Sequence, residues 1–227
     1  MIDRSGPSGG VFRAVSLGRR SEPTDTYGGR NDAEYMSLAD DDTQTNSVIA
    51  GAAAGAVAYV LGYLFAYVTQ RNQVEEQLAG FNVFADLFGG DPIPAWQGVG
   101  WLFYNAHFVA TEIPSLVGGA RSLNLIAEAD GGSLTLLYVV PPLLLIAVGL
   151  VVGRLAGASD PPDGARAGVF VIAGYLPLAV IGAFLFRYSV GDGSVAPDLV
   201  TAVLLAGVVY PAAFGAIGGA ASTVLSD

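Results

Sequence analysis

The residues best suited to chemistry lie in one stretch, WLFYNAHFVATEIP, at positions 101–114. It contains the single histidine of the chain, His107, with Asn105 two residues before it and Glu112 five residues after it. A histidine can act as a general base, a metal ligand or a proton sensor. A metal site needs several such ligands, and a catalytic histidine needs a nucleophile or a second acid–base group beside it. The sequence places neither near His107, so we predict no metal site, no cofactor and no catalytic centre.

If this stretch is helical, Trp101, Asn105 and Glu112 share one face, because their offsets bring the chain back to the same side. Tyr104 and His107 then lie on the neighbouring face, and Glu112 is poorly aligned with His107. The favoured interpretation is a structural histidine, hydrogen-bonded to a carbonyl or a tyrosine. Proton sensing or contact with a substrate is the alternative. These five residues form the candidate functional cap.

Other catalytic signals are weak. The segment GPSGG at residues 6–10 matches G-x-S-x-G, but it lies in a polar tail without the strand and helix of a nucleophile elbow. No metalloprotease, P-loop or dinucleotide-binding motif occurs, and the chain has no cysteine. The net charge of −10 disfavours nucleic acid as a partner, since phosphate binding requires a basic patch. We therefore predict that the protein is not an enzyme.

The elements that must position these residues are membrane helices. The chain is 52% hydrophobic and 13% charged with a mean hydropathy of +0.53, whereas soluble domains carry about 25% charged residues. Helices of about 20 apolar residues cross a bilayer. The sequence predicts an all-α, polytopic transmembrane helix bundle in the lipid bilayer, with spans at about 48–69, 133–152, 167–186 and 199–221.

The remaining segments are a tail and a cap. Residues 1–46 are polar and predicted to be a disordered cytoplasmic tail, while residues 47–227 form the transmembrane domain. The spans place the protein in the cell membrane, and the five arginines of the tail indicate that its N-terminus lies in the cytoplasm. Residues 70–132 are predicted to form an outward-facing amphipathic or re-entrant helical cap. The alternative is a fifth span over residues 92–111, and counting arginines does not separate the two arrangements.

Small residues recur on two helix faces. One face carries Gly51, Gly55 and Gly62, and the last span carries Gly207, Gly215 and Gly219. Small side chains let helix backbones approach closely, so both faces are predicted to pack against other helices. A partner on these faces could be a helix of a second copy or of another protein. The alternative is that glycine is simply common in membrane helices.

Each of the last three spans has a proline close after a tyrosine. The sets are Tyr138 with Pro141 and Pro142, Tyr175 with Pro177, and Tyr210 with Pro211. Proline removes a backbone hydrogen bond and kinks a helix, so three kinked helices could surround a small cavity or hinge. The alternative is that these prolines are ordinary features of membrane helices.

The segment GVGWLFYNAHFV, with the four-span pattern and the acidic, lysine-free composition, resembles uncharacterised multi-pass membrane proteins of haloarchaea. The resemblance implies a halophilic source and a membrane location, but no activity, and the label "transporter" for such proteins rests on hydropathy. We predict a non-catalytic accessory or scaffold subunit assembled through glycine- and alanine-rich helix faces. The alternative is a small transporter or channel with a pathway between the kinked helices. A cavity lined by Tyr138, Tyr175 and Tyr210 would favour transport, and an exposed face at Gly51 and Gly55 would favour assembly.

Overall fold

The structure is a computed structural model that describes residues 28–87, 91–115, 119–129, 132–191 and 193–225. Contacts divide the chain into two units, Met1–Ala39 and Asp40–Asp227. All packing described below belongs to the second unit. The first helix, α1 (Gly28–Leu87), begins in the first unit. Residues 28–46 of the predicted tail are part of this helix, and the tail before residue 28 lies outside the described residues.

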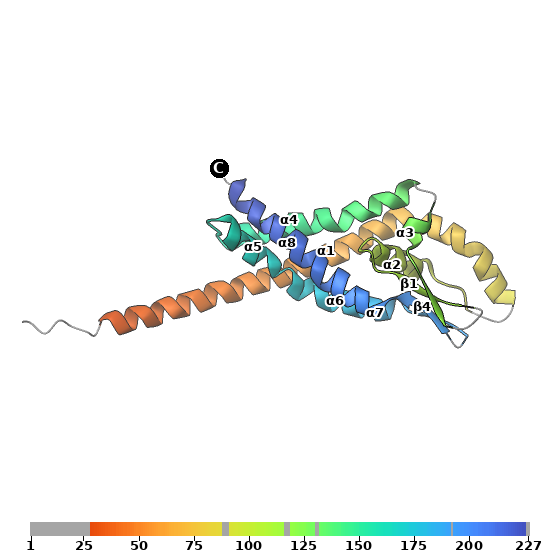
Figure 1. Cartoon of the computed structure of the whole chain (residues 1–227), viewed down its shortest axis with the longest axis horizontal. Coiled ribbons are helices and arrows are strands. Elements are labelled where there is room, and N and C mark those ends of the chain that lie inside the picture. The colour runs from red at the N-terminus through yellow and green to blue at the C-terminus, as the bar shows by residue number, and fades with distance from the viewer. Residues whose placement is uncertain (1–27, 88–90, 116–118, 130–131, 192, 226–227) are drawn as a thin grey trace, which may run out of the picture. The chain divides into compact units, whose positions relative to one another are not determined.

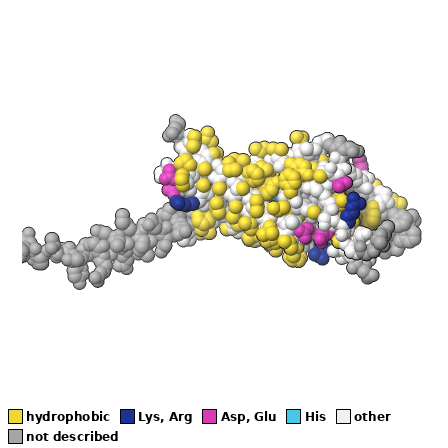
Figure 2. Space-filling view, viewed as in Figure 1, with side chains coloured by type: hydrophobic (Ala, Val, Ile, Leu, Met, Phe, Trp, Pro, Cys, Tyr) yellow, Lys and Arg dark blue, Asp and Glu magenta, His cyan; other side chains and the backbone are white. Residues whose placement is uncertain are grey.

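Among the described residues, four helical segments are long and apolar enough to cross a membrane: Thr45–Val83, Leu134–Leu155, Pro161–Leu185 and Leu199–Val224. The predicted number of four is confirmed. In element order they are α1; η1 (Gly132–Val139) with α4 (Val140–Leu155); α5 (Pro161–Val169) with α6 (Ile172–Leu185); and α7 (Leu199–Thr201), η2 (Ala202–Val209) and α8 (Tyr210–Val224). Figure 2 shows their apolar side chains as a band with charged side chains at its two ends. These features indicate a membrane location.

A small sheet joins two connections that are far apart in the sequence. β1 (Thr111–Pro114) and β2 (Ala120–Leu123) follow α2 (Ala95–Asn105) and precede α3 (Leu125–Glu128), between the first two apolar segments. β3 (Tyr188–Val190) and β4 (Gly193–Pro197) lie between the last two. The strands are antiparallel in the order β2-β1-β4-β3, and β1 and β4 lie side by side next to α2 in Figure 1. The all-α prediction was therefore wrong in this region.

The sheet had a signal in the sequence. Residues 188–195 read YSVGDGSV, in which β-branched and aromatic residues flank a glycine-rich turn, a pattern typical of a hairpin. Gly191 has a φ of +55°, a conformation that glycine adopts at little cost.

The alternative of a fifth span is excluded by the course of the chain after α2. This helix has 11 residues and covers roughly 16 Å, about half of a bilayer core. The chain then turns through residues 106–110 and enters β1. The predicted alignment of Trp101, Asn105 and Glu112 on one helix was wrong, because Glu112 lies on a strand. The predicted amphipathic helix after residue 70 is the continuation of α1.

The glycine faces pack inside the chain. A Cβ atom on Gly55 would collide with the carbonyl oxygen of Val171, and one on Gly51 would meet Phe170. The face of α8 packs in the same way, since Gly215 lies against Gly168 and Gly219 lies against Gly164. Of the other two, Gly62 faces Phe103 and Leu144, and Gly207 faces Leu176. All six glycines are buried against helices of their own chain.

The prolines occupy three different settings. Pro141 and Pro142 lie in the first turn of α4, directly after the 3₁₀ segment η1. Pro211 lies in the first turn of α8, directly after the π-helical segment η2. A proline in the first turn of a helix removes no hydrogen bond of that helix, because the N–H groups of the first turn have no acceptor within it. The missing N–H instead removes a hydrogen bond to the helical turn that precedes it. Among the described helices these prolines mark changes of helix type, whereas Pro177 lies inside α6.

Candidate functional site

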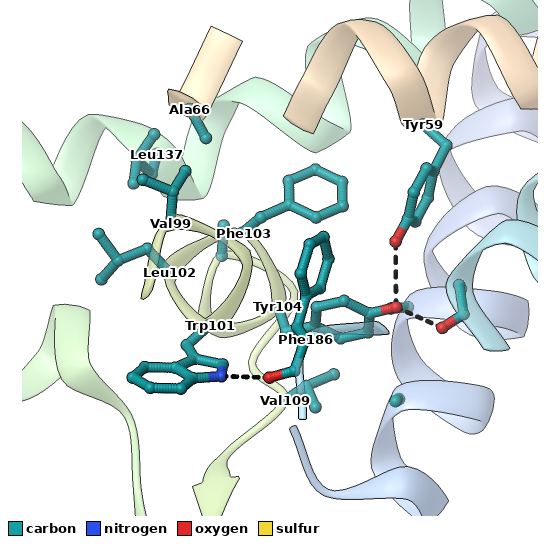
Figure 3. Close-up of a cluster of buried hydrophobic side chains, with 14 of the residues drawn as sticks. Tyr59, Ala66, Val99, Trp101, Leu102, Phe103, Tyr104, Val109, Leu137 and Phe186 are labelled. Carbon is teal, nitrogen blue, oxygen red and sulfur yellow. Dashed lines mark hydrogen bonds between the residues drawn. The ribbon is translucent and has the colours of Figure 1, made fainter. Parts of the chain in front are cut away.

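The helix α2 is enclosed by the apolar helices. Its residues from Gln97 to Asn105 are all buried, although several are polar. On one side, Val99 and Leu102 lie next to Leu137 of η1 and Ala66 of α1 in the buried cluster of Figure 3. Because α2 is buried all round, its polar side chains need partners within the protein.

Two of these side chains bind the carboxyl end of the third apolar segment. The indole nitrogen of Trp101 donates to the carbonyl oxygen of Phe186 at 2.7 Å (Figure 3), and Gln97 donates to that of Arg187 at 2.9 Å. The last carbonyl groups of a helix have no partner within the helix, so such donors satisfy them. Gly100 makes room, since a Cβ atom there would collide with the ring of Phe186. α2 is thereby fixed to the end of α6.

Tyr104 makes a second connection to α6. Its hydroxyl group donates to the carbonyl oxygen of Ala179, and the hydroxyl group of Tyr59 on α1 lies 3.1 Å from it (Figure 3). Because Tyr104 uses its proton for Ala179, Tyr59 is the donor between the two tyrosines. Burial raises the pKa of Tyr104 above its usual value, so this side chain stays neutral.

Asn105 closes the turn that follows α2. Its side-chain nitrogen donates to the carbonyl oxygen of Val109 at 2.7 Å and to the hydroxyl group of Thr111 at 3.1 Å. Its side-chain oxygen accepts from the backbone N–H of Leu125 at 2.9 Å. The side chain of Asn124 in turn donates to the Asn105 backbone carbonyl at 3.1 Å. This fully buried amide therefore joins α2, β1 and α3.

His107 is enclosed and bonded at both ring nitrogens. Its Nδ1 atom lies 2.8 Å from the carbonyl oxygen of Phe103, and its Nε2 atom lies 2.7 Å from the hydroxyl group of Tyr175. A carbonyl oxygen only accepts, so the proton is on Nδ1 and Tyr175 donates to Nε2. Burial lowers the pKa of His107 to about 4, so the ring is neutral at neutral pH. These contacts are those of a structural histidine.

The three tyrosines predicted to line a cavity converge on the turn at His107 and Phe108. Tyr175 binds His107, and the ring of Tyr210 lies 5.0 Å from the imidazole ring. Tyr138 stacks on Phe108 with ring centres 4.8 Å apart. Phe108 has a φ of +59°, which is uncommon for a side chain of this size. The tyrosines therefore contact protein side chains at this turn.

The structure separates Glu112 from the other candidate residues. Trp101, Tyr104, Asn105 and His107 are buried, whereas Glu112 is half-buried on β1, opposite Ser122 and Ala196. Within the described part of the chain, no group of three or more His, Cys, Asp or Glu residues could hold a metal ion. Sequence reasoning missed Asn124, although the pattern NLIAE carries a helix N-cap signal, and its side chain accepts from Ile126 and Ala127.

Comparison with curated proteins and with solved structures found no match. A family model matches residues 33–226, which covers the four apolar segments, α2 and the sheet. The chain belongs to this family, DUF7978, a family of unknown function.

Proposed function

We propose that the protein is a non-catalytic accessory subunit that lies in the membrane, and that its cap is the surface on which a partner protein docks. From here on, the cap means the described residues 91–129 and 186–198, which contain α2, α3 and the sheet. It differs from the predicted cap, because residues 70–87 belong to α1. The observation that carries the proposal is the attachment of α2 to α6 through Trp101 and Gln97. With the pairing of β1 and β4, it holds the cap in one orientation on the helix bundle.

Other contacts argue against the predicted assembly through the glycine faces and against the alternative, a pathway between kinked helices. Gly51 and Gly55 are buried against Phe170 and Val171, so assembly through this face would require opening the chain's own packing. Tyr175 donates a hydrogen bond to His107 and Tyr210 packs against its ring, so both tyrosines already have partners within the protein. A surface outside the apolar band is therefore the better candidate for a partner.

The burial and the hydrogen bonds of His107 support the non-catalytic part of the proposal. His107 is 0% exposed, and both of its ring nitrogens are occupied. A general base must reach the proton that it removes, either directly or through one water molecule. The imidazole ring instead connects α2 to α6, which is a structural task.

We also propose the orientation in the cell membrane and a halophilic source. With four spans, the five tail arginines share one side with Arg154 and Arg166, and the cap side has Arg71, Arg121 and Arg187. The positive-inside rule then places the tail in the cytoplasm and the cap outside. Ten arginines, no lysine and a net charge of −10 fit a protein that works in concentrated salt, as in haloarchaea.

Photo-crosslinking in intact membranes of the native host tests the docking surface. A photoreactive amino acid is placed at Arg121 or Ser122, which are exposed on β2, and at Ile181, which is exposed on the apolar band, as the control. We expect one discrete protein adduct from both cap positions and none from position 181. The mass of the adduct distinguishes a second copy of this chain from another protein. No protein adduct from either cap position would contradict the proposal.

A further inference from the structure

A pocket lies where α1 passes the cap. Its volume is about 340 Å³, within the range of sites that bind small molecules. α1 contributes Val74, Gln77 and Leu78, and α2 contributes Trp101 and Leu102. Gly98 of α2, Glu128 and Ala129 at the end of α3, and Leu134 at the start of the second apolar segment form most of the remaining wall.

The pocket has an apolar interior with a fixed aromatic ring. The Trp101 indole group is held by its hydrogen bond to Phe186, so its orientation is set before any ligand binds. Gly98 and Val74 bring α1 and α2 together here, since a Cβ atom on Gly98 would lie 2.7 Å from Val74. A preformed apolar pocket of this kind favours a ligand with an apolar body.

The polar groups of the pocket favour a cation. Its wall contains one charged side chain, Glu128, and one amide, Gln77, and both residues are exposed. Within the described residues, Glu128 has no ion-pair partner. On the cap and residues 70–87 of α1, seven described carboxylates accompany three arginines, and one of these, Arg71, is paired with Glu75. This field attracts cations and repels anions.

The pocket also lies near the end of the apolar band. Arg71, one helical turn before Val74, is exposed and paired with Glu75, so α1 is already in a polar environment there. Leu136, two residues after Leu134, is 67% exposed, as expected for a lipid-facing side chain. An amphiphile at the membrane surface could therefore enter from the side.

We propose that this pocket binds a small amphiphilic cation, with its apolar body against Trp101 and Leu102 and its ammonium group beside Glu128. The inference concerns the pocket alone and needs no protein partner, so it can fail while the docking proposal stands, and the reverse also holds.

Calorimetric titration of the intact protein in an uncharged detergent tests the inference with three probes that differ only in the head group: 4-phenylbutylamine, 4-phenylbutanol and 5-phenylvalerate. We expect the amine to bind about fivefold more tightly than the alcohol, and the carboxylate to bind most weakly. Raising the salt concentration should weaken the binding of the amine and leave that of the alcohol unchanged. Equal affinities for the three probes, or no binding of the amine, would overturn the inference.

Two variants and one control locate the site. Glu128→Gln should weaken the amine about fivefold and leave the alcohol unaffected. Glu76→Gln removes an exposed carboxylate that does not line the pocket and should change neither affinity. Ala129→Phe fills the pocket from its rim and should abolish the binding of both probes. If Ala129→Phe does not fold, Glu128→Gln decides alone, and an unchanged amine affinity in that variant refutes the site.

A second arm identifies the source of the cation. The titration is repeated in vesicles of phosphatidylcholine with and without phosphatidylethanolamine. Competition by phosphatidylethanolamine against the amine supports the same site with a lipid head group as its ligand. Amine binding that is insensitive to this lipid supports a free amphiphile.

Discussion

The hydroxyl group of Tyr175 on α6 donates a hydrogen bond of 2.7 Å to Nε2 of His107, at the end of α2. Residues 68 positions apart thus meet in the interior, and the same imidazole ring also packs against Phe103 and Tyr210. The lone histidine of the chain therefore joins the cap to two of the apolar segments. Its removal or protonation should weaken that junction.

The first prediction concerns pH. The pKa of His107 is about 4 in the folded protein and about 6.5 in the unfolded chain, so between these values the unfolded state binds more protons. Stability from this group is complete above about pH 6.5 and falls by about 3 kcal/mol as the pH drops towards 4. Denaturant unfolding in detergent at several pH values measures this loss of unfolding free energy. In His107→Gln the decline should be smaller by that amount; an identical decline in both proteins would contradict the assignment.

The second prediction removes the partner of His107. Tyr175→Phe keeps the ring but leaves the Nε2 atom of a buried imidazole without a donor, which should cost about 1–3 kcal/mol of unfolding free energy. Tyr67→Phe is the control, because Tyr67 is a half-buried tyrosine on α1 outside this contact. Thermal unfolding of both variants gives the comparison, and equal losses would count against a specific role for the bond.

The third prediction concerns the packing of α1. Gly55→Ala places a Cβ atom against the carbonyl oxygen of Val171 and should destabilise the protein by about 1–3 kcal/mol. Gly80→Ala on the same helix has no neighbouring atom within 4 Å and should be neutral or stabilising by up to about 1 kcal/mol. Because Gly55 packs within the chain, its effect should not depend on protein concentration. A concentration-dependent loss would point to packing between subunits.

The fourth prediction concerns the start of the last apolar segment. Asp198 accepts from the backbone N–H of Thr201 at 3.0 Å and from its hydroxyl group at 2.6 Å, and these bonds lower the pKa of Asp198. Asp198→Ala should cost about 1 kcal/mol at neutral pH. The stabilisation is present at neutral pH and is lost as the pH falls through the lowered pKa. Unfolding of wild type and variant at low pH should therefore converge; a constant difference would contradict the assignment.

The fifth prediction concerns topology. The chain has no cysteine, so Ser122→Cys on β2 and Ser159→Cys between α4 and α5 each supply a single thiol. An impermeant maleimide added to intact cells should label position 122 and reach position 159 only after lysis. The opposite pattern would reverse the orientation, and labelling of both positions in intact cells would contradict four spans.

The apolar segments could be predicted because hydropathy over about 20 residues is a local property. The cap could not be predicted in the same way. α2 is buried all round, so it has no polar face to set a helical period. The partners of its side chains, Ala179 and Phe186, lie within and at the end of another span. The hairpin at residues 188–197 carried a local signal, but its pairing with β1 did not. Gly51 and Gly55 were identified as a packing face, but sequence cannot say whether the partner helix belongs to the same chain.

The pairing of β1 with β4 has a consequence for biogenesis. β1 meets β2 within its own connection, whereas Thr111 and Glu112 find Pro197 and Ala196 only after two further membrane helices have been synthesised. During insertion, this edge of β1 and the polar groups of α2 stay without their final partners until residues 186–197 have been synthesised. The order of synthesis therefore makes the cap one of the last parts to mature, and truncation before residue 186 should leave an insertion intermediate that chaperones or proteases recognise.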